Sequence, residues 1–204
     1  MNFIAWFKSK TADKVLFPVR NQIIELIESD SNVLEVGCGT GDLLFRMSNN
    51  IEYGLGVDLD PRMIDFAKNK IAKENVNNLA FIERDIQSLN NSLLSKFNIS
   101  TSTLCFHEMS EKDAISSLSL LGNHTQKIII ADYAAPNTFW GKVSIEIDEL
   151  ISGHYNRFRH YRNKGRIPYL AKKAGLGIRA EIGTSIDGIL IWILDGKNAN
   201  GKAH

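Results

Sequence analysis

The sequence predicts an α/β fold with helices on both faces of a mostly parallel sheet, and three observations lead to it. Short β-rich runs alternate with amphipathic helical runs along most of the chain. A glycine-rich turn follows the first β-rich run. Near the end, two β-rich runs are joined through Asp187 and Gly188, which predicts a hairpin with one antiparallel strand. The 204 residues, of which 44% are hydrophobic, fit one globular domain better than two.

Local signals set the limits of the helices and strands. The predicted strands cover residues 32–36, 53–58, 79–83, part of 99–106, 127–132, 178–182 and 189–194. An opening helix begins near Pro18, a residue suited to the first helical position. Asp60 followed by Pro61 predicts the cap and first turn of a later helix. Ser110 with Asp113 three residues later predicts another capped helix, after the fourth strand.

Composition excludes several classes of protein. The formal net charge is +1, so the whole chain produces no strong field toward nucleic acid or membranes. Its apolar runs, such as Gly188–Leu194, are far shorter than the roughly 20 residues that span a bilayer. Met1–Phe7 lack the basic region of a signal peptide. Cys38 and Cys105 have no metal-site or disulfide spacing, so we expect a reducing, cytoplasmic setting.

A glycine loop and an acidic residue predict a nucleoside-binding site. Gly37, Gly39 and Gly41 stand where the first strand turns into a helix, and glycines there let the backbone approach a ligand. Asp58 ends the second strand, 21 residues beyond Gly37. A carboxylate at that spacing can accept hydrogen bonds from both hydroxyls of a ribose. The alternative, in which the glycines only allow tight packing and Asp58 only ends a strand, does not account for the joint spacing.

The glycine spacing then separates two kinds of adenosine ligand. The dinucleotide fingerprint is G-x-G-x-x-G, whereas here Asp42 holds the position of the third glycine and would repel a pyrophosphate. The segment LEVGCGTG resembles the first motif of the class I methyltransferases that use S-adenosylmethionine. That resemblance implies a Rossmann-like three-layer sandwich with a seven-stranded sheet. Cys38 within the motif is open to a second interpretation, as a small space-filling side chain.

The resemblance implies a set of cofactor-binding residues: Glu35, Gly37, Cys38, Gly39, Gly41, Asp58, Leu59, Asp85, Ile86 and Phe106. By this resemblance Glu35 holds the methionine amino group, Asp58 binds the ribose and Leu59 lies against the adenine. Asp85 would accept from the adenine amino group, and the backbone N–H of Ile86 would donate to the ring. A simple turn role for Asp85 stays open.

The acceptor side has fewer signals. The run LCFHEM is similar to the fourth-strand ending of the same family, which lies beside the transferable methyl. His107 in this run is the best candidate for a general base, and the alternative is an imidazole that is hydrogen-bonded without transferring a proton. Tyr155 is a second catalytic candidate, because it and His154 lie on the course of an apolar, helix-compatible stripe. Asp132 and Tyr133 end the fifth strand and are candidate substrate contacts.

A basic segment lies between Glu149 and Glu181. It contains eight Lys or Arg residues and no acid, which leaves 16 basic against 23 acidic residues in the rest of the chain. One hypothesis is that this segment attracts an anionic acceptor such as a carboxylate, a phosphate or a lipid head group. The alternative is a solvated helix face that pairs with the acidic remainder of the chain.

Together these observations predict an S-adenosylmethionine-dependent methyltransferase that acts on a small molecule, anionic or lipid-like. The broad resemblance is to the group with quinone C-methyltransferases and phospholipid N-methyltransferases. Two alternatives are an NAD-dependent oxidoreductase and a non-catalytic module that binds S-adenosylmethionine or S-adenosylhomocysteine. The predicted segments are 1–30 (helical or lid), 31–135 (cofactor-binding core), 136–176 (acceptor side) and 177–195 (hairpin).

The predicted partners follow from the same motifs. No nucleic-acid partner is expected, because the chain lacks an Asn/Asp-Pro-Pro-aromatic tetrad and no proline precedes Cys105. A lipid acceptor would make the apolar stretch Phe3–Phe7 a peripheral membrane contact rather than a lid or packing segment. The acceptor atom and the oligomeric state are not encoded in these motifs, and no metal site is predicted.

Overall fold

The strands have the limits that hydrophobic patterning predicts, to within about a residue at most ends. The computed structural model describes residues 12–135 and 155–197. Its strands are β1 (Asn32–Val36), β2 (Tyr53–Asp58), β3 (Leu79–Glu83), β4 (Ile99–Thr103), β5 (Lys127–Tyr133), β6 (Gly177–Gly183) and β7 (Ile189–Asp195). They form a seven-stranded sheet in the order β3-β2-β1-β4-β5-β7-β6. Parallel pairing joins β3, β2, β1 and β4, whereas β7 runs antiparallel to β5 and β6. The predicted fold class is confirmed.

Packing contacts cluster into two units, Met1–Thr103 and Leu104–His204. The helices of the first unit are α2 (Ala12–Val15), α3 (Phe17–Glu25), α4 (Asp42–Met47), α5 (Pro61–Glu74), the 3-10 turn η1 (Ile86–Ser88) and α6 (Asn91–Leu94). Those of the second unit are the 3-10 turn η2 (Phe106–Glu108), α7 (Glu111–His124), α9 (Tyr155–Lys164) and α10 (Arg166–Ala174).

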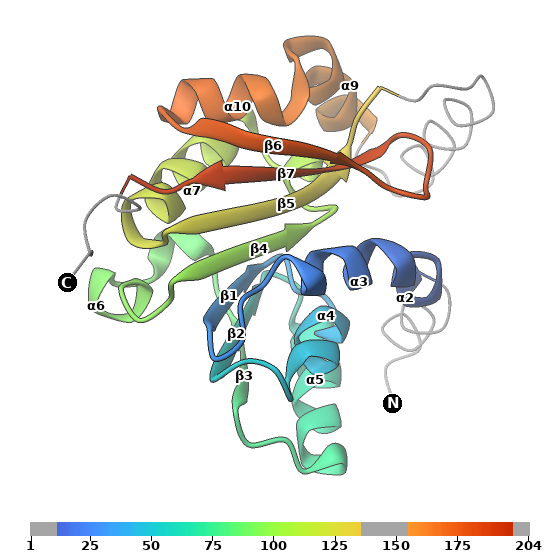
Figure 1. Ribbon diagram of the computed structural model, residues 1–204, viewed down its shortest axis with the longest axis vertical. Coiled ribbons are helices and arrows are strands. Elements are labelled where there is room, and N and C mark those ends of the chain that lie inside the picture. The colour runs from blue at the N-terminus through green and yellow to red at the C-terminus, as the bar shows by residue number, and fades with distance from the viewer. Residues whose placement is uncertain (1–11, 136–154, 198–204) are drawn as a thin grey trace. The chain divides into compact units, whose positions relative to one another are not determined.

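The first unit packs helices against parallel strands. Figure 1 shows α4 and α5 beside β2, and both helices contact that strand. Met63, Ile64 and Ala67 form the buried face of α5, at the helical spacing that the sequence predicts. As predicted, the Asp60 side chain caps this helix by accepting a hydrogen bond from the backbone N–H of Arg62.

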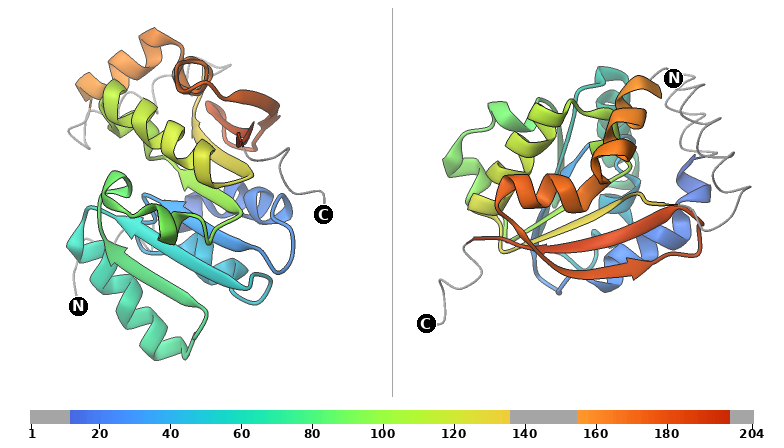
Figure 2. Two further views of the ribbon diagram at one scale, coloured as in Figure 1. Left: turned by 90° about the vertical axis from the view of Figure 1, so that its left-hand side faces the viewer. Right: turned by 90° about the horizontal axis from the view of Figure 1, so that it is seen from above.

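The second unit places two helices on one face of its strands. Figure 2 shows α7 and α10 side by side there, where α7 contacts β5 and α10 contacts β6. Gly122 of α7 allows this close approach, because a Cβ on it would stand 2.4 Å from a methyl of Leu176. Trp192 of β7 is buried in the core of this unit. The predicted cap of α7 is also confirmed, since Ser110 accepts from the N–H of Asp113 at 3.2 Å.

Two changes in chain direction were not predicted, one at the end of a strand and one at the end of a helix. Both result from residues with positive φ. Strand β4 ends at Thr103, because Leu104 takes a positive φ of 50° and the chain turns into η2. Helix α9 ends where Gly165 and Arg166 both take positive φ, which redirects the chain into α10.

Several predictions fall on residues outside the described ranges. They concern the apolar stretch Phe3–Phe7 and the first part of the apolar stripe up to His154. The four predicted segment boundaries stay predictions. In the part of the chain that the structure describes, no helix has the length and apolar character needed to cross a bilayer.

Candidate functional site

The glycine loop between β1 and α4 is bare backbone at its centre. Gly37, Gly39 and Gly41 all take positive φ, at 68°, 53° and 76°. A Cβ on Gly41 would stand 2.4 Å from Cζ of Phe81, so this glycine is required for packing. A Cβ on Gly39 would meet no atom within 4 Å. The packing interpretation therefore holds for Gly41, whereas Gly39 borders open space that a ligand can fill.

The backbone N–H groups of this loop have acceptors inside the protein. Gly37 and Cys38 both donate to the carbonyl of Val57, at 2.9 and 3.1 Å. The N–H of Gly39 donates to the Asp58 carboxylate at 2.7 Å. A pyrophosphate-binding loop offers such N–H groups to its ligand instead. The loop thus favours a ligand that approaches the backbone without a phosphate.

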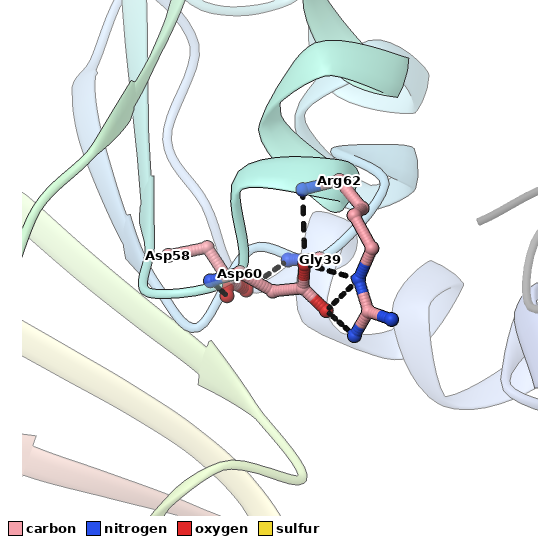
Figure 3. Close-up of polar contacts among 4 residues, drawn as sticks. All are labelled: Gly39, Asp58, Asp60 and Arg62. Atoms are coloured by element: carbon pink, nitrogen blue, oxygen red, sulfur yellow. Dashed lines mark hydrogen bonds and ion pairs between the residues drawn. The ribbon is translucent and has the colours of Figure 1, made fainter. Parts of the chain in front are cut away.

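Asp58 and Asp60 are two residues apart but have different partners, as Figure 3 shows. The half-buried carboxylate of Asp58 accepts from the N–H of Gly39 through one oxygen and from the N–H of Asp60 through the other, at 2.9 Å. Asp60 caps α5 and forms an ion pair with Arg62 at 2.6 Å. Leu59 between them is 70% exposed. Contact of Asp58 with a ribose and of Leu59 with the adenine stays a prediction.

Asp42 does not act as the sequence argument assumed. Its carboxylate is held by two guanidinium groups, those of Arg20 at 2.9 Å and Arg46 at 2.6 Å. These cations offset its charge, so repulsion of a pyrophosphate by Asp42 is weak. The case against a dinucleotide now depends on the N–H groups of the loop.

Glu35, the predicted partner of a methionine amino group, is buried on β1.

The other predicted cofactor residues of the first unit have structural roles of their own. The Cys38 side chain fills space over Gly56, where an added Cβ would stand 2.8 Å from its Sγ. Asp85 is exposed and caps η1, because its side chain accepts from the N–H of Gln87 at 2.9 Å. Ile86 is buried in the same turn. Cofactor contact by these residues stays a prediction.

In the second unit, His107 is paired with a buried carboxylate. Its Nδ1 lies 2.7 Å from Oδ1 of Asp132, and its backbone N–H donates to Oδ2 at 3.3 Å. The N–H of Tyr133 also donates to Asp132, at 2.7 Å. Asp132 is 0% exposed and His107 is 2% exposed. Asp132 therefore orients the imidazole and is too buried to make the contact with a methyl acceptor that the sequence predicts. Both residues lie at strand ends that the sequence predicts, whereas their pairing has no signal in the sequence.

Three aromatic rings surround this imidazole. The ring centroids of Tyr133, Tyr161 and Phe158 lie 4.7, 6.3 and 6.4 Å from that of His107. The hydroxyl of Tyr161 donates to the carbonyl of Tyr133 at 3.1 Å. Burial, and then the nearby charge of Asp132, raise the pKa of Tyr161 well above its ordinary value, so this phenol stays neutral.

A pocket of about 270 Å³ lies next to this cluster, between η2, α7, α9 and α10. Its apolar and aromatic lining comes from Phe106, Met109, Ala114, Tyr161, Tyr169 and Leu170. Phe106 is therefore a pocket residue, whereas His107 is not part of the lining among the described residues. Tyr155 begins α9, and the role of its side chain stays a prediction.

One carboxylate in the pocket joins three helices. The hydroxyl of Tyr169 on α10 donates to Glu111 of α7 at 2.6 Å, and Nε2 of His160 on α9 lies 2.7 Å from the other carboxylate oxygen. These two hydrogen bonds lower the pKa of Glu111, which is therefore ionised at neutral pH. Sequence analysis missed this group, because its partners are 49 and 58 residues away along the chain.

Comparison with known proteins decides the family. The sequence matches the family described as "Methyltransferase domain" over residues 27–175, which is most of the chain. The chain belongs to this methyltransferase family. Among curated relatives, the ribosomal protein L11 methyltransferase of Clostridium botulinum is 34% identical over 61 residues, which are 29% of this chain and 20% of that protein. The chain therefore matches only about a fifth of that relative's length.

Solved structures of other methyltransferases have the same fold. An S-adenosylmethionine-dependent methyltransferase from Clostridium acetobutylicum matches with a TM-score of 0.64 at 13% identity, over 94% of this chain and 97% of that chain. Magnesium protoporphyrin IX methyltransferase from Synechocystis, with S-adenosylhomocysteine bound, matches with a TM-score of 0.62 at 18% identity, over 96% and 87%. Family and fold together support S-adenosylmethionine as the cofactor of this methyltransferase.

Proposed function

We propose that this methyltransferase transfers a methyl group from S-adenosylmethionine to a small molecule that is anionic or lipid-like. The observation that carries the proposal is the open space at Gly39, whose N–H is bonded to the Asp58 carboxylate. A bare backbone next to a ribose-binding acid suits an adenosyl ligand. S-adenosylmethionine supplies, when bound, a methyl group on a sulfonium that an acceptor can displace.

In this proposal, side chains of the first unit hold the cofactor. Asp58 accepts hydrogen bonds from the ribose through its remaining lone pairs, since an ionised carboxylate has about four acceptor positions. The exposed Leu59 covers the adenine, and Asp85 with the N–H of Ile86 contacts its polar edge. Glu35 and the loop Gly37–Gly41 hold the methionine end. Phe106 belongs to the second unit, and its contact with the cofactor stays a prediction.

His107 and Tyr155 remain the proposed catalytic residues, and the geometry limits what His107 can do. Asp132 fixes the imidazole at Nδ1, so a proton could be taken up only at Nε2. Such uptake is needed only for an acceptor that must lose a proton, for example a phenol or a protonated amine. Without it, His107 is a positioning residue that Asp132 holds against the ring of Tyr133.

The finer resemblance to quinone C-methyltransferases and phospholipid N-methyltransferases is part of this proposal, as is a cytoplasmic location. A relative that matches part of this chain is, by its name, a methyltransferase of ribosomal protein L11, so a protein acceptor is the alternative. A small-molecule acceptor is favoured by the concave, largely apolar pocket of the second unit.

The cofactor part of the proposal is tested by titrating S-adenosylhomocysteine and NAD into the purified protein by calorimetry. Matched variants are Asp58→Asn and Asp60→Asn, which remove one negative charge each at neighbouring positions. We expect S-adenosylhomocysteine and not NAD to bind, with affinity at least about tenfold weaker in Asp58→Asn, since a charged hydrogen-bond acceptor is lost. Asp60→Asn should bind as the wild type does, because asparagine caps a helix equally well.

Either of two results would overturn this part. One is the absence of S-adenosylhomocysteine binding, and the other is an equal loss of affinity in both variants. Transfer itself is tested with S-adenosylmethionine carrying a labelled methyl group and a pool of small-molecule acceptors. Binding without any consumption of label would favour the non-catalytic module over the enzyme.

A further inference from the structure

Three cationic side chains line the pocket of the second unit: Arg157 and Lys164 on α9, and Arg166 on α10. Within the described residues of this unit, none of them lies within ion-pair distance of a carboxylate. Arg157 donates to the backbone carbonyl of Glu108 at 3.0 Å, which fixes the guanidinium without neutralising it. The Nε of Arg166 is buried and has no hydrogen-bond partner in the described structure. A buried donor without a partner is costly unless a ligand meets it, whereas Arg157 and Lys164 are exposed and contribute positive charge at the rim.

The single acid of the pocket offsets these charges only in part, although the Glu111 carboxylate interacts electrostatically with Lys164. Glu111 uses one carboxylate oxygen for Tyr169 and the other for His160. With three cations and one carboxylate, the lining carries a formal charge of +2 when His160 is neutral. The positive charge therefore belongs to the pocket and is available to a bound anion.

The rest of the lining is apolar. Phe106, Met109, Ala114 and Leu170 provide carbon surface from three different elements, and Tyr161 adds a buried ring whose hydroxyl already has an acceptor. The volume of about 270 Å³ is at the lower end of ligand pockets, which hold about 300–1,000 Å³. This space suits the body of a small molecule and is too small to enclose a two-chain lipid.

We propose that this pocket binds a compact organic anion, with a carboxylate or phosphate head against Arg157, Lys164 and Arg166 and an apolar body against Phe106 and Leu170. That this anion is the methyl acceptor rests on the proposed function, whereas the binding site itself does not.

The competing explanation is a basic helix face that attracts any anion from solution. Two exposed cations outside the pocket separate the explanations: Arg159 on α9 and Lys172 on α10. Each lies on the same helix as a pocket cation, Arg157 or Arg166. Diffuse attraction would weaken equally when any of the four charges is removed, whereas a pocket depends on two of them.

The experiment titrates the full-length protein with three probes that share a phenyl group: 3-phenylpropionate, phenyl phosphate and the neutral 3-phenylpropan-1-ol. Binding is followed by calorimetry at low and moderate salt. We expect saturable binding of at least one anion at one site per chain, and at least about tenfold weaker binding of the alcohol. The two anions distinguish a carboxylate from a phosphate head. Equal affinity for anion and alcohol, or no saturable binding of either anion, would overturn the proposal.

Paired variants locate the site. Arg157→Gln and Arg166→Gln should each weaken binding of the preferred anion by about tenfold or more, as expected when a charge-assisted hydrogen bond is lost. The controls Arg159→Gln and Lys172→Gln should stay within about twofold of the wild type. Circular dichroism and melting curves of all four variants check that the fold is kept. An equal, salt-sensitive loss in controls and pocket variants would mean that the helix face, and not the pocket, attracts the anion.

A parallel titration with S-adenosylhomocysteine keeps this inference separate from the proposed function. If S-adenosylhomocysteine binds and the anions do not, the pocket proposal fails and the methyltransferase proposal stands. If the anions bind and S-adenosylhomocysteine does not, the pocket proposal stands and the proposed methyl transfer from S-adenosylmethionine fails.

Discussion

The glycine loop of the first unit and the pocket of the second unit are built in different ways. The loop is a backbone site: its shape comes from positive φ at Gly37, Gly39 and Gly41, and its one anchoring carboxylate, Asp58, ends the next strand. The pocket is a side-chain site, assembled from η2 and α7 on one side and from α9 and α10 on the other. Its polar contacts join residues about fifty positions apart, such as Glu111 and His160.

This difference explains what each site can do. A backbone site presents the same surface whatever the neighbouring side chains are, so it suits a ligand shared by a whole family. A side-chain site changes with every substitution, so it can distinguish one acceptor from another. We therefore expect the two sites to respond differently to mutation, and the following changes test this from the largest effect to the smallest.

The largest effect on the free energy of unfolding is expected at Asp132, which is buried in the second unit and accepts three hydrogen bonds there. Asp132→Asn keeps the size of the side chain but removes the charge that the imidazole of His107 and two backbone N–H groups meet. Breaking a fully buried, hydrogen-bonded pair costs about 3–5 kcal/mol. Urea unfolding should show this loss, whereas the exposed Asp113→Asn should change the free energy of unfolding by less than about 1 kcal/mol. A loss below about 1 kcal/mol in Asp132→Asn would mean that the pocket wall does not depend on this pair.

The next effect separates two glycines of the loop. Gly41→Ala forces a Cβ to within 2.4 Å of Phe81 at a positive φ, so we expect a loss of about 2–4 kcal/mol. Gly39→Ala has the same backbone strain but open space, so its cost should be about 1 kcal/mol. For ligand binding we expect the larger loss in Gly39→Ala, because its methyl group enters the space that we assign to the cofactor. Unfolding curves and S-adenosylhomocysteine titrations of both variants measure the two orders. If Gly39→Ala leaves binding unchanged, the open space is not the cofactor site.

The same contrast explains what could be predicted from the sequence. The loop, Asp58 and the cap at Asp60 could be predicted because each depends on residues that are near in sequence or at a fixed spacing between neighbouring parallel strands. The pairing of Asp132 with His107 depends on a turn at Leu104, whose positive φ no local pattern indicates. The Glu111 network depends on the break between α9 and α10 at Gly165 and on the packing of three helices. Asp42 was misjudged in part for a related reason, since one partner, Arg20, lies 22 residues earlier, whereas Arg46 at the i+4 position could have been predicted.

The smallest effect concerns Glu111, the carboxylate that joins α7 to α9 and α10. The hydrogen bond from Tyr169, and then that from His160, lower its pKa from the ordinary value of about 4.5. A group with a lowered pKa in the folded state stabilises the protein above its ordinary pKa and loses this contribution as the pH falls through the folded value. Glu111→Gln should therefore lower the melting temperature slightly at pH 7, and the difference from the wild type should disappear on the acid side of about pH 4.5.

A second titration, at alkaline pH, checks the same contact through the phenol of Tyr169, which donates the hydrogen bond to Glu111. The Glu111 carboxylate raises the pKa of Tyr169 above about 10, because it accepts the phenolic proton in a hydrogen bond. In Glu111→Gln this pKa should return toward its ordinary value, which ultraviolet titration of the phenols can follow, with Tyr169→Phe identifying the signal. An unchanged tyrosine titration, together with an unchanged acid limb of the melting curve, would mean that Glu111 does not join the three helices in solution. The pocket would then have a free carboxylate beside its cations, and its preference for anions should weaken accordingly.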